Sequence, residues 1–86
     1  MTQLEKAIEI AVAAHAGQKG NDGTPYILHS LRLMLKMKSE QEHIVAVLHD
    51  VVEDTSTIFD DLHAAGFSDN IIESLKLLTD EKDVML

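Results

Sequence analysis

Four titratable residues close an otherwise apolar stretch, IVAVLHDVVEDT, at residues 44 to 55. His49 and Asp50 come first, and Glu53 and Asp54 follow. In a helix, residues four apart lie one above the other on one face, so His49 would stack on Glu53 and Asp50 on Asp54. Burying such charges is costly unless a partner compensates them. The pattern therefore predicts a divalent-cation site with carboxylates beside it for proton transfer.

A third ligand is expected from the preceding apolar stretch, which contains His29. Because the connection is short, we expect the two stretches to be neighbours in a helical fold, so the predicted metal ligands are His29, His49 and Asp50. Nitrogen and oxygen donors without sulfur favour Mn, Fe, Zn, Co or Ni over Mg or Ca. The alternative is structural: His49 would be a buried, hydrogen-bonded histidine and Asp50 a helix cap.

Glu53 and Asp54 are the predicted catalytic pair, which would position or deprotonate a water. The alternative is a charged helix end that faces solvent. Lys19 and Tyr26 are candidate substrate-binding residues, because a lysine in a polar loop near a tyrosine could meet an anion. The loop GQKGNDGT does not match GxxxxGK[ST], so a P-loop is excluded.

The remaining histidines are interpreted as structural or surface residues, with ligand contact as the alternative for His15. His15 stands just before a glycine, where a histidine can bond loop backbone or favour a helix C-terminus. His43 and His63 have no candidate partners nearby in the sequence and are expected on the surface.

Apolar residues at helical spacing, interrupted by end signals, predict the elements that must position these side chains. No stretch alternates as a strand would, so the expected fold is all-α with short connections. The expected helices cover 3–16, 25–37, 40–52 or beyond, a short fourth one ending at residue 65, and 69–79, with an irregular tail at 80–86. The expected caps are Thr2 with Glu5, Ser39 with Glu42, one of Thr55, Ser56 or Thr57, and Ser68.

Composition narrows the class of protein further. The chain has 86 residues, enough for one small domain, and its few aromatic residues imply an aliphatic core. Fifteen acidic and seven basic residues give a net charge of −8, which argues against binding nucleic acid or anionic membranes. Cysteine is absent, no stretch is long enough to span a bilayer, and the N-terminus is unlike a signal peptide, so a cytoplasmic protein is expected.

Several stretches occur in an order and spacing typical of one family: AHAGQ at 14–18, GTPYILHSLRLML at 23–35, VAVLHDVVEDT at 45–55, GFS at 66–68 and LLT at 77–79. The chain resembles the HD-domain hydrolase module of RelA/SpoT-type proteins, including the small stand-alone alarmone hydrolases. The resemblance covers roughly residues 4 to 79, and HDVVEDT together with PYILH is its specific part.

This resemblance implies a helical HD-type bundle that binds one Mn ion and hydrolyses the 3′-pyrophosphate of guanosine tetra- or pentaphosphate. By position, His29 matches the histidine of the PYxxH motif, and His49 with Asp50 matches the HD ligands. Glu53 and Asp54 match the pair that assists attack by water. The sequence departs from the family in its loop, where Lys19 to Asp22 replace an Arg-Lys pair, and at Ser30, which replaces a proline.

The family's last metal ligand is an aspartate on a later helix, so we expect the chain to correspond to the N-terminal half of such a domain, one partial HD domain over 1–86. An apolar face left open would favour a homodimer. The predicted function is a metal-dependent alarmone 3′-pyrophosphohydrolase. Two alternatives remain: an inactive HD-like helical module that acts through self-association, and an HD phosphohydrolase for another nucleotide.

Overall fold

The computed structural model describes the backbone of residues 1–84 and the side chains of residues 1–78. Within residues 1–84, five helices follow one another: α1 (Gln3–Ala14), α2 (Ile27–Leu35), α3 (Glu40–Asp54), α4 (Phe59–Ala64) and α5 (Asp69–Val84). Among the described residues the only extended pairing is a single bridge between Lys19 and Pro25. The predicted all-α, HD-like bundle is confirmed.

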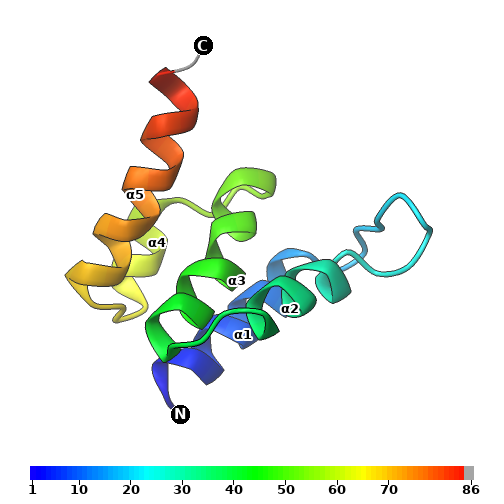
Figure 1. The fold of residues 1–86 in the computed structure, drawn as a ribbon, viewed down its shortest axis with the longest axis horizontal. Helices are drawn as coiled ribbons and strands as arrows, with labels where there is room; N and C mark the ends of the chain where they lie inside the picture. Colours follow the sequence, from blue (N-terminus) through cyan, green and yellow to red (C-terminus); the bar gives the residue numbers. More distant parts are fainter. Residues whose placement is uncertain (85–86) are drawn as a thin grey trace.

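Helix α3 is the central element, with α1 and α2 packed on one side of it and α5 on the other (Figure 1). Its apolar face supplies much of the core, and Val47, Leu48 and Val51 are completely buried. The core is aliphatic as expected, with Phe67 as its aromatic member. The buried apolar residues are Ala7, Ala11, Met34, Ile44, Val47, Leu48, Val51, Leu62, Phe67, Ile71, Ile72 and Leu75. Helix α3 can therefore hold polar groups at its C-terminal end in fixed positions.

Two helices begin with the predicted capping boxes. The Glu5 amide donates to Thr2 Oγ1 at 3.1 Å, and the Thr2 amide donates to Glu5 Oε1 at 2.8 Å. Ser39 and Glu42 repeat the arrangement at the start of α3, at 3.1 and 3.0 Å. These hydrogen bonds hold the pKa of both glutamates below its usual value. Capping boxes therefore fix where α1 and α3 begin.

The predicted cap of the fourth helix is wrong. Thr55 ends α3 instead, because its Oγ1 donates to the Val51 carbonyl at 2.6 Å and its own amide donates to the same carbonyl. The start of α4 is stabilised from within, by Asp61 Oδ2 accepting from the Ile58 amide at 2.9 Å. The Thr55 hydroxyl lies between α3 and α4 and bonds to the end of α3.

Other helix ends differ modestly from expectation. Helix α1 ends before His15, and α2 is shorter than 25–37 because Pro25 pairs with Lys19 rather than entering the helix. Helix α5 continues to Val84 rather than ending at residue 79, since the sequence there contains neither glycine nor proline. The rest of the expected tail, residues 85 and 86, lies outside the described residues. None of the described helices has the length and apolar character needed to cross a membrane.

Candidate metal centre

The C-terminal half of α3 and the first turn of α2 meet at Asp50. Its side chain is only 11% exposed, and both of its oxygens face imidazoles: Oδ2 lies 3.9 Å from His29 Nε2, and Oδ1 lies 4.0 Å from His49 Nδ1. The His29 side chain is 60% exposed, so this ligand candidate lies at the solvent edge of the cluster. Asp50 thus lies close to both His29 and His49, whereas the described group whose ligand atoms all lie within 4.8 Å of one another is His49, Asp50 and Glu53, without His29.

These distances suit a shared cation. Two atoms that each bind one ion at about 2.1 Å lie at most about 4.2 Å apart. The distance from His29 Nε2 to Asp50 Oδ2 and the distance from His49 Nδ1 to Asp50 Oδ1 are each below this limit, so each imidazole can share a cation with Asp50. A nearly buried carboxylate facing two imidazoles is also a donor set that borderline transition metals favour. The residues present therefore fit a divalent transition metal.

Glu53 joins this cluster, although the sequence predicted a catalytic role for it. Its Oε2 lies 3.1 Å from His49 Nε2, one helical turn away, and ligand atoms of His49, Asp50 and Glu53 all lie within 4.8 Å of one another. A neutral imidazole has one N–H and one lone pair. If His49 Nε2–H donates to Glu53, Nδ1 keeps its lone pair on the side of Asp50 for a cation.

Asp54, the second residue of the predicted catalytic pair, is bonded to Tyr26. The Tyr26 hydroxyl donates to Asp54 Oδ2 at 2.9 Å. Burial, followed by this hydrogen bond and by the charges of Asp50, Asp54 and Glu53, raises the pKa of Tyr26 to about 12. Tyr26 is therefore a neutral hydrogen-bond donor throughout the physiological range and holds the Asp54 carboxylate in one orientation.

His15 and Gln18 contact Tyr26 and Asp54 and help to hold them in place. His15 is 2% exposed, and its ring packs against that of Tyr26 in a tilted arrangement, with centroids 4.9 Å apart. Its Nδ1 lies 2.9 Å from Gln18 Oε1, and Gln18 Nε2 donates to the Asp54 carbonyl at 3.5 Å. The bond expected from His15 to loop backbone is thus made to a side chain instead.

The other two histidines lie outside the centre. His63 is exposed, 3.9 Å from Asp69. His43 is not the surface residue that was expected: it is partly buried, with Nε2 2.9 Å from the Met37 carbonyl. The turn after α2 provides this partner, which sequence neighbours alone do not reveal.

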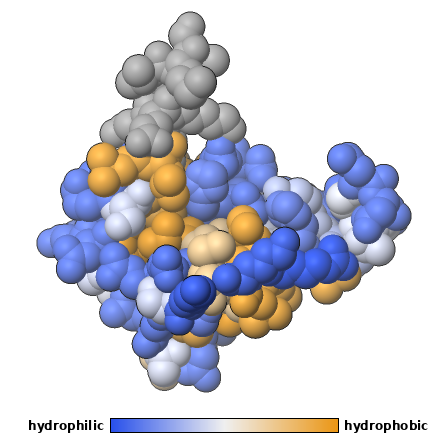
Figure 2. All heavy atoms as spheres, viewed as in Figure 1, coloured by the Kyte–Doolittle hydropathy of each residue, from blue (hydrophilic) through white to orange (hydrophobic). Residues whose placement is uncertain are grey.

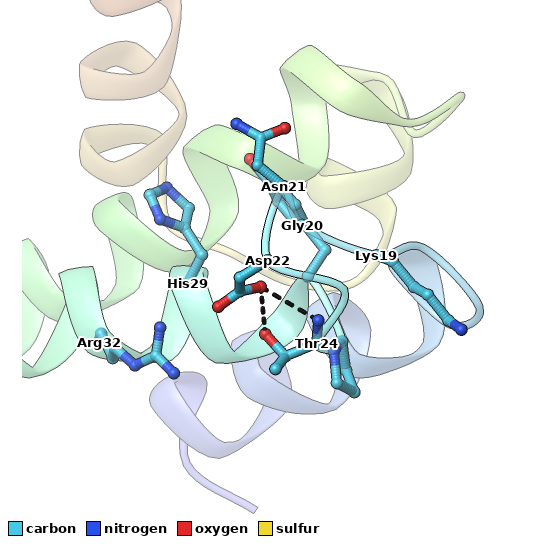
Figure 3. Close-up of a pocket in the computed structure, with 9 residues that line it drawn as sticks. Lys19, Gly20, Asn21, Asp22, Thr24, His29 and Arg32 are labelled. Atoms are coloured by element: carbon cyan, nitrogen blue, oxygen red, sulfur yellow. Dashed lines mark hydrogen bonds between the residues drawn. The ribbon is translucent and has the colours of Figure 1, made fainter.

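A cleft of about 520 Å³ opens beside the cluster, between the loop after α1 and helix α2 (Figure 3). Lys19 and Tyr26, the predicted substrate-binding residues, both line it, together with His29. Arg32, one turn after His29, lines it as well and was not predicted.

Curated proteins resemble this chain over most of its length. A 64-residue match, 70% of the chain, is 36% identical to the guanosine-3′,5′-bis(diphosphate) 3′-pyrophosphohydrolase of Aquifex aeolicus and covers 9% of that protein. A match of the same extent is 38% identical to the bifunctional (p)ppGpp synthase/hydrolase SpoT of Escherichia coli and covers 9% of it. This chain is homologous to a segment of the RelA/SpoT-type proteins.

The RelA/SpoT relatives include plant proteins. The putative chloroplastic GTP diphosphokinase RSH1 of Arabidopsis thaliana is 41% identical over 59 residues, which is 64% of the chain and 7% of that protein. The chain thus spans less than a tenth of the curated relatives it matches. No protein-family profile matches it.

Ser30 is a further site residue that the RelA/SpoT pattern did not reveal. It is completely buried, and its Oγ donates to Asp50 Oδ2 at 3.0 Å. The proline that the resemblance implies at this position has no hydroxyl with which to make the bond. A polar residue next to His29 within an apolar stretch was the available signal.

Proposed function

We propose that this chain carries the metal-binding part of a phosphohydrolase that releases pyrophosphate from the 3′ position of guanosine tetra- or pentaphosphate, with Mn as its cation. The observation that carries the proposal is the buried Asp50 carboxylate, which has His29 and His49 at 3.9 and 4.0 Å. Hydrolysis of this kind is also what the names of the Aquifex and E. coli relatives describe for those proteins.

In this proposal His29, His49 and Asp50 hold the cation. A bound divalent cation supplies Lewis acidity and lowers the pKa of water at the site. Ser30 fixes the orientation of Asp50 through its 3.0 Å hydrogen bond. Glu53, with Oε2 3.1 Å from His49 Nε2, fixes the tautomer of that imidazole. Such outer partners keep ligands oriented and basic.

Asp54 is the better candidate for the general base. It is exposed and so accessible to water, and Tyr26 holds one of its oxygens at 2.9 Å. The Glu53 side chain is only 14% exposed and faces His49. We therefore assign proton transfer to Asp54 and an orienting role to Glu53, which refines the predicted Glu53–Asp54 pair.

Metal binding tests the first half of this proposal. We expect calorimetric titration of chelator-treated protein with Mn to show one site. His49→Ala and Asp50→Asn should each weaken it at least about tenfold, since even outer partners contribute this much. His63→Ala, an exposed histidine outside the cluster, is the matched control. Equal Mn affinity in all four proteins would contradict the proposed ligands.

Activity tests the second half. With Mn present, we expect pyrophosphate release from guanosine 3′,5′-bis(diphosphate), and Asp54→Asn should lower kcat by about 100-fold or more while Mn affinity is kept. A folded, Mn-loaded protein that releases no pyrophosphate would overturn the proposed reaction. Release from a different nucleotide only would instead support a hydrolase with another substrate.

A second candidate function is self-association. Its supporting observation is an apolar cleft of about 460 Å³ between α2, α3 and α5, whose apolar lining includes Leu33, Met37, Val45 and Leu78. A helical module that dimerises through this face would need no metal.

A further inference from the structure

The cleft beside His29 has one wall built by an ordered loop. Lys19 pairs with Pro25, and the Gly20 amide donates to the Thr24 carbonyl at 2.8 Å. Asp22 Oδ1 closes the loop by accepting from the Thr24 amide at 3.1 Å and from Thr24 Oγ1 at 2.7 Å (Figure 3). These bonds fix the loop, so the cleft is a built feature of the surface.

The facing wall is helix α2, which presents His29 and, one turn on, Arg32. Residues three apart on a helix share a face. In Figure 3 the end groups of Lys19 and Arg32 lie at opposite ends of the group of residues drawn, and the Arg32 guanidinium is on the side of Asp22 and His29. Arg32 is therefore the positively charged residue of α2 that lies nearest to His29, the candidate metal ligand on this helix.

The residues that line this cleft differ in charge from the protein as a whole. The chain carries 15 acidic and 7 basic residues, yet this cleft is lined by two cations, Lys19 and Arg32, and by one carboxylate, Asp22. A cleft lined by more positive than negative groups, on a protein with a net negative charge, raises the local concentration of anions. A guanidinium can also bind a phosphate through two parallel N–H···O bonds.

We propose that Arg32 forms a second phosphate subsite, which holds a phosphate group of the substrate remote from the group attacked at the metal centre. This inference rests on the proposed function and narrows it, because it selects nucleotides that carry two separate phosphate groups. Asp22 opposes the subsite. The pKa of Asp22 is lowered by the hydrogen bonds from Thr24 and, to a smaller extent, by the charge of Arg32, so Asp22 is ionised and competes for the guanidinium.

Binding without turnover tests the subsite. The dissociation constant of guanosine 3′,5′-bis(diphosphate) is measured by calorimetry in a chelator, which prevents metal-dependent hydrolysis. Arg32→Gln should weaken binding about tenfold or more, as expected for losing charge-assisted hydrogen bonds. Asp22→Asn should strengthen it, because the amide oxygen still accepts from Thr24 while the competing charge is gone. Circular dichroism verifies that each variant is folded.

The control is Lys36→Gln, which removes the same charge from an exposed residue at the end of α2, outside the cleft. Its affinity should stay close to that of wild type. Guanosine diphosphate, with one diphosphate group, should lose less affinity than the bis(diphosphate) when Arg32 is replaced. Equal affinities of Arg32→Gln and Lys36→Gln, or no binding by wild type, would overturn the subsite.

This experiment separates the two proposals. Binding that depends on Arg32, in a protein that shows no hydrolysis with Mn, would keep the subsite and refute the reaction. Hydrolysis with Mn that is indifferent to Arg32→Gln in KM and kcat would keep the reaction and refute the subsite.

Discussion

The pKa of Tyr26 provides a measure of the electrostatic environment of the candidate site. It is the only tyrosine and the chain has no tryptophan, so the near-ultraviolet absorbance of tyrosinate comes from this residue alone. In metal-free protein we expect its ionisation near pH 12 rather than 10, because burial, the Asp54 hydrogen bond and the nearby carboxylates all disfavour the phenolate. A midpoint near 10 in folded protein would show that Tyr26 is not held against Asp54.

The same shift predicts how stability depends on pH. Between pH 10 and about 12 the unfolded chain loses the tyrosine proton while the folded chain keeps it, so the free energy of unfolding falls as pH rises through this window. Tyr26→Phe removes this contribution. Denaturant unfolding on either side of pH 10 should therefore show a smaller loss in the variant than in wild type.

Ser30 gives a second prediction for a single side chain. Ser30→Ala leaves a buried carboxylate without its 3.0 Å donor, and we expect a loss of about 1 to 3 kcal/mol in the free energy of unfolding of metal-free protein. Ser74→Ala is the control, because its hydroxyl bonds the Asn70 carbonyl at an exposed position. Equal small losses in both variants would mean that Ser30 does not support Asp50.

Helix α3 carries the site at one end and its capping box at the other. Ser39→Ala removes the acceptor of the Glu42 amide, so we expect a loss of about 1 kcal/mol in stability. Mn affinity of the folded protein should not change, because Ser39 lies three turns from His49. Urea unfolding and calorimetry measure the two effects. Ser56→Ala, in the exposed loop after α3, should change neither.

Local sequence was sufficient for features whose partners are close in the chain. The capping boxes at Thr2 and Ser39 and the stacking of His49 on Glu53 follow from spacings of three and four residues. The cap assigned to Thr55, Ser56 or Thr57 was wrong because the ends of α3 and α4 compete for the same hydroxyl groups, and spacing does not say which end receives them.

Contacts between helices were the part that sequence patterns did not supply. Ser30 meets Asp50 across 20 residues, and Tyr26 meets Asp54 across 28. Both depend on how α2 lies against α3, which is decided by packing of the whole core. The sequence therefore named His49 and Asp50 as members of the cluster but gave Glu53 a catalytic role, and the supports of Asp50 and Asp54 became visible only in the fold.

At the scale of the whole molecule, several large apolar side chains are exposed rather than packed in the core. Figure 2 shows apolar side chains over α5 and across the middle of the face drawn. Leu77 is 64% and Leu78 43% exposed. Leu78 borders the apolar cleft between α2, α3 and α5.

This cleft is where a second copy of the chain would bind if the predicted homodimer forms. We expect sedimentation velocity to show concentration-dependent association of wild type, and Leu78→Glu to shift it to monomer, because a charge cannot be buried there without a partner. Val12→Glu, at an exposed position on α1 outside the cleft, is the control. A wild type that stays monomeric across the series would rule out the dimer. His49 lines the same cleft. Association through this cleft would therefore place the second copy of the chain against the candidate metal centre. Mn binding should then change the association constant.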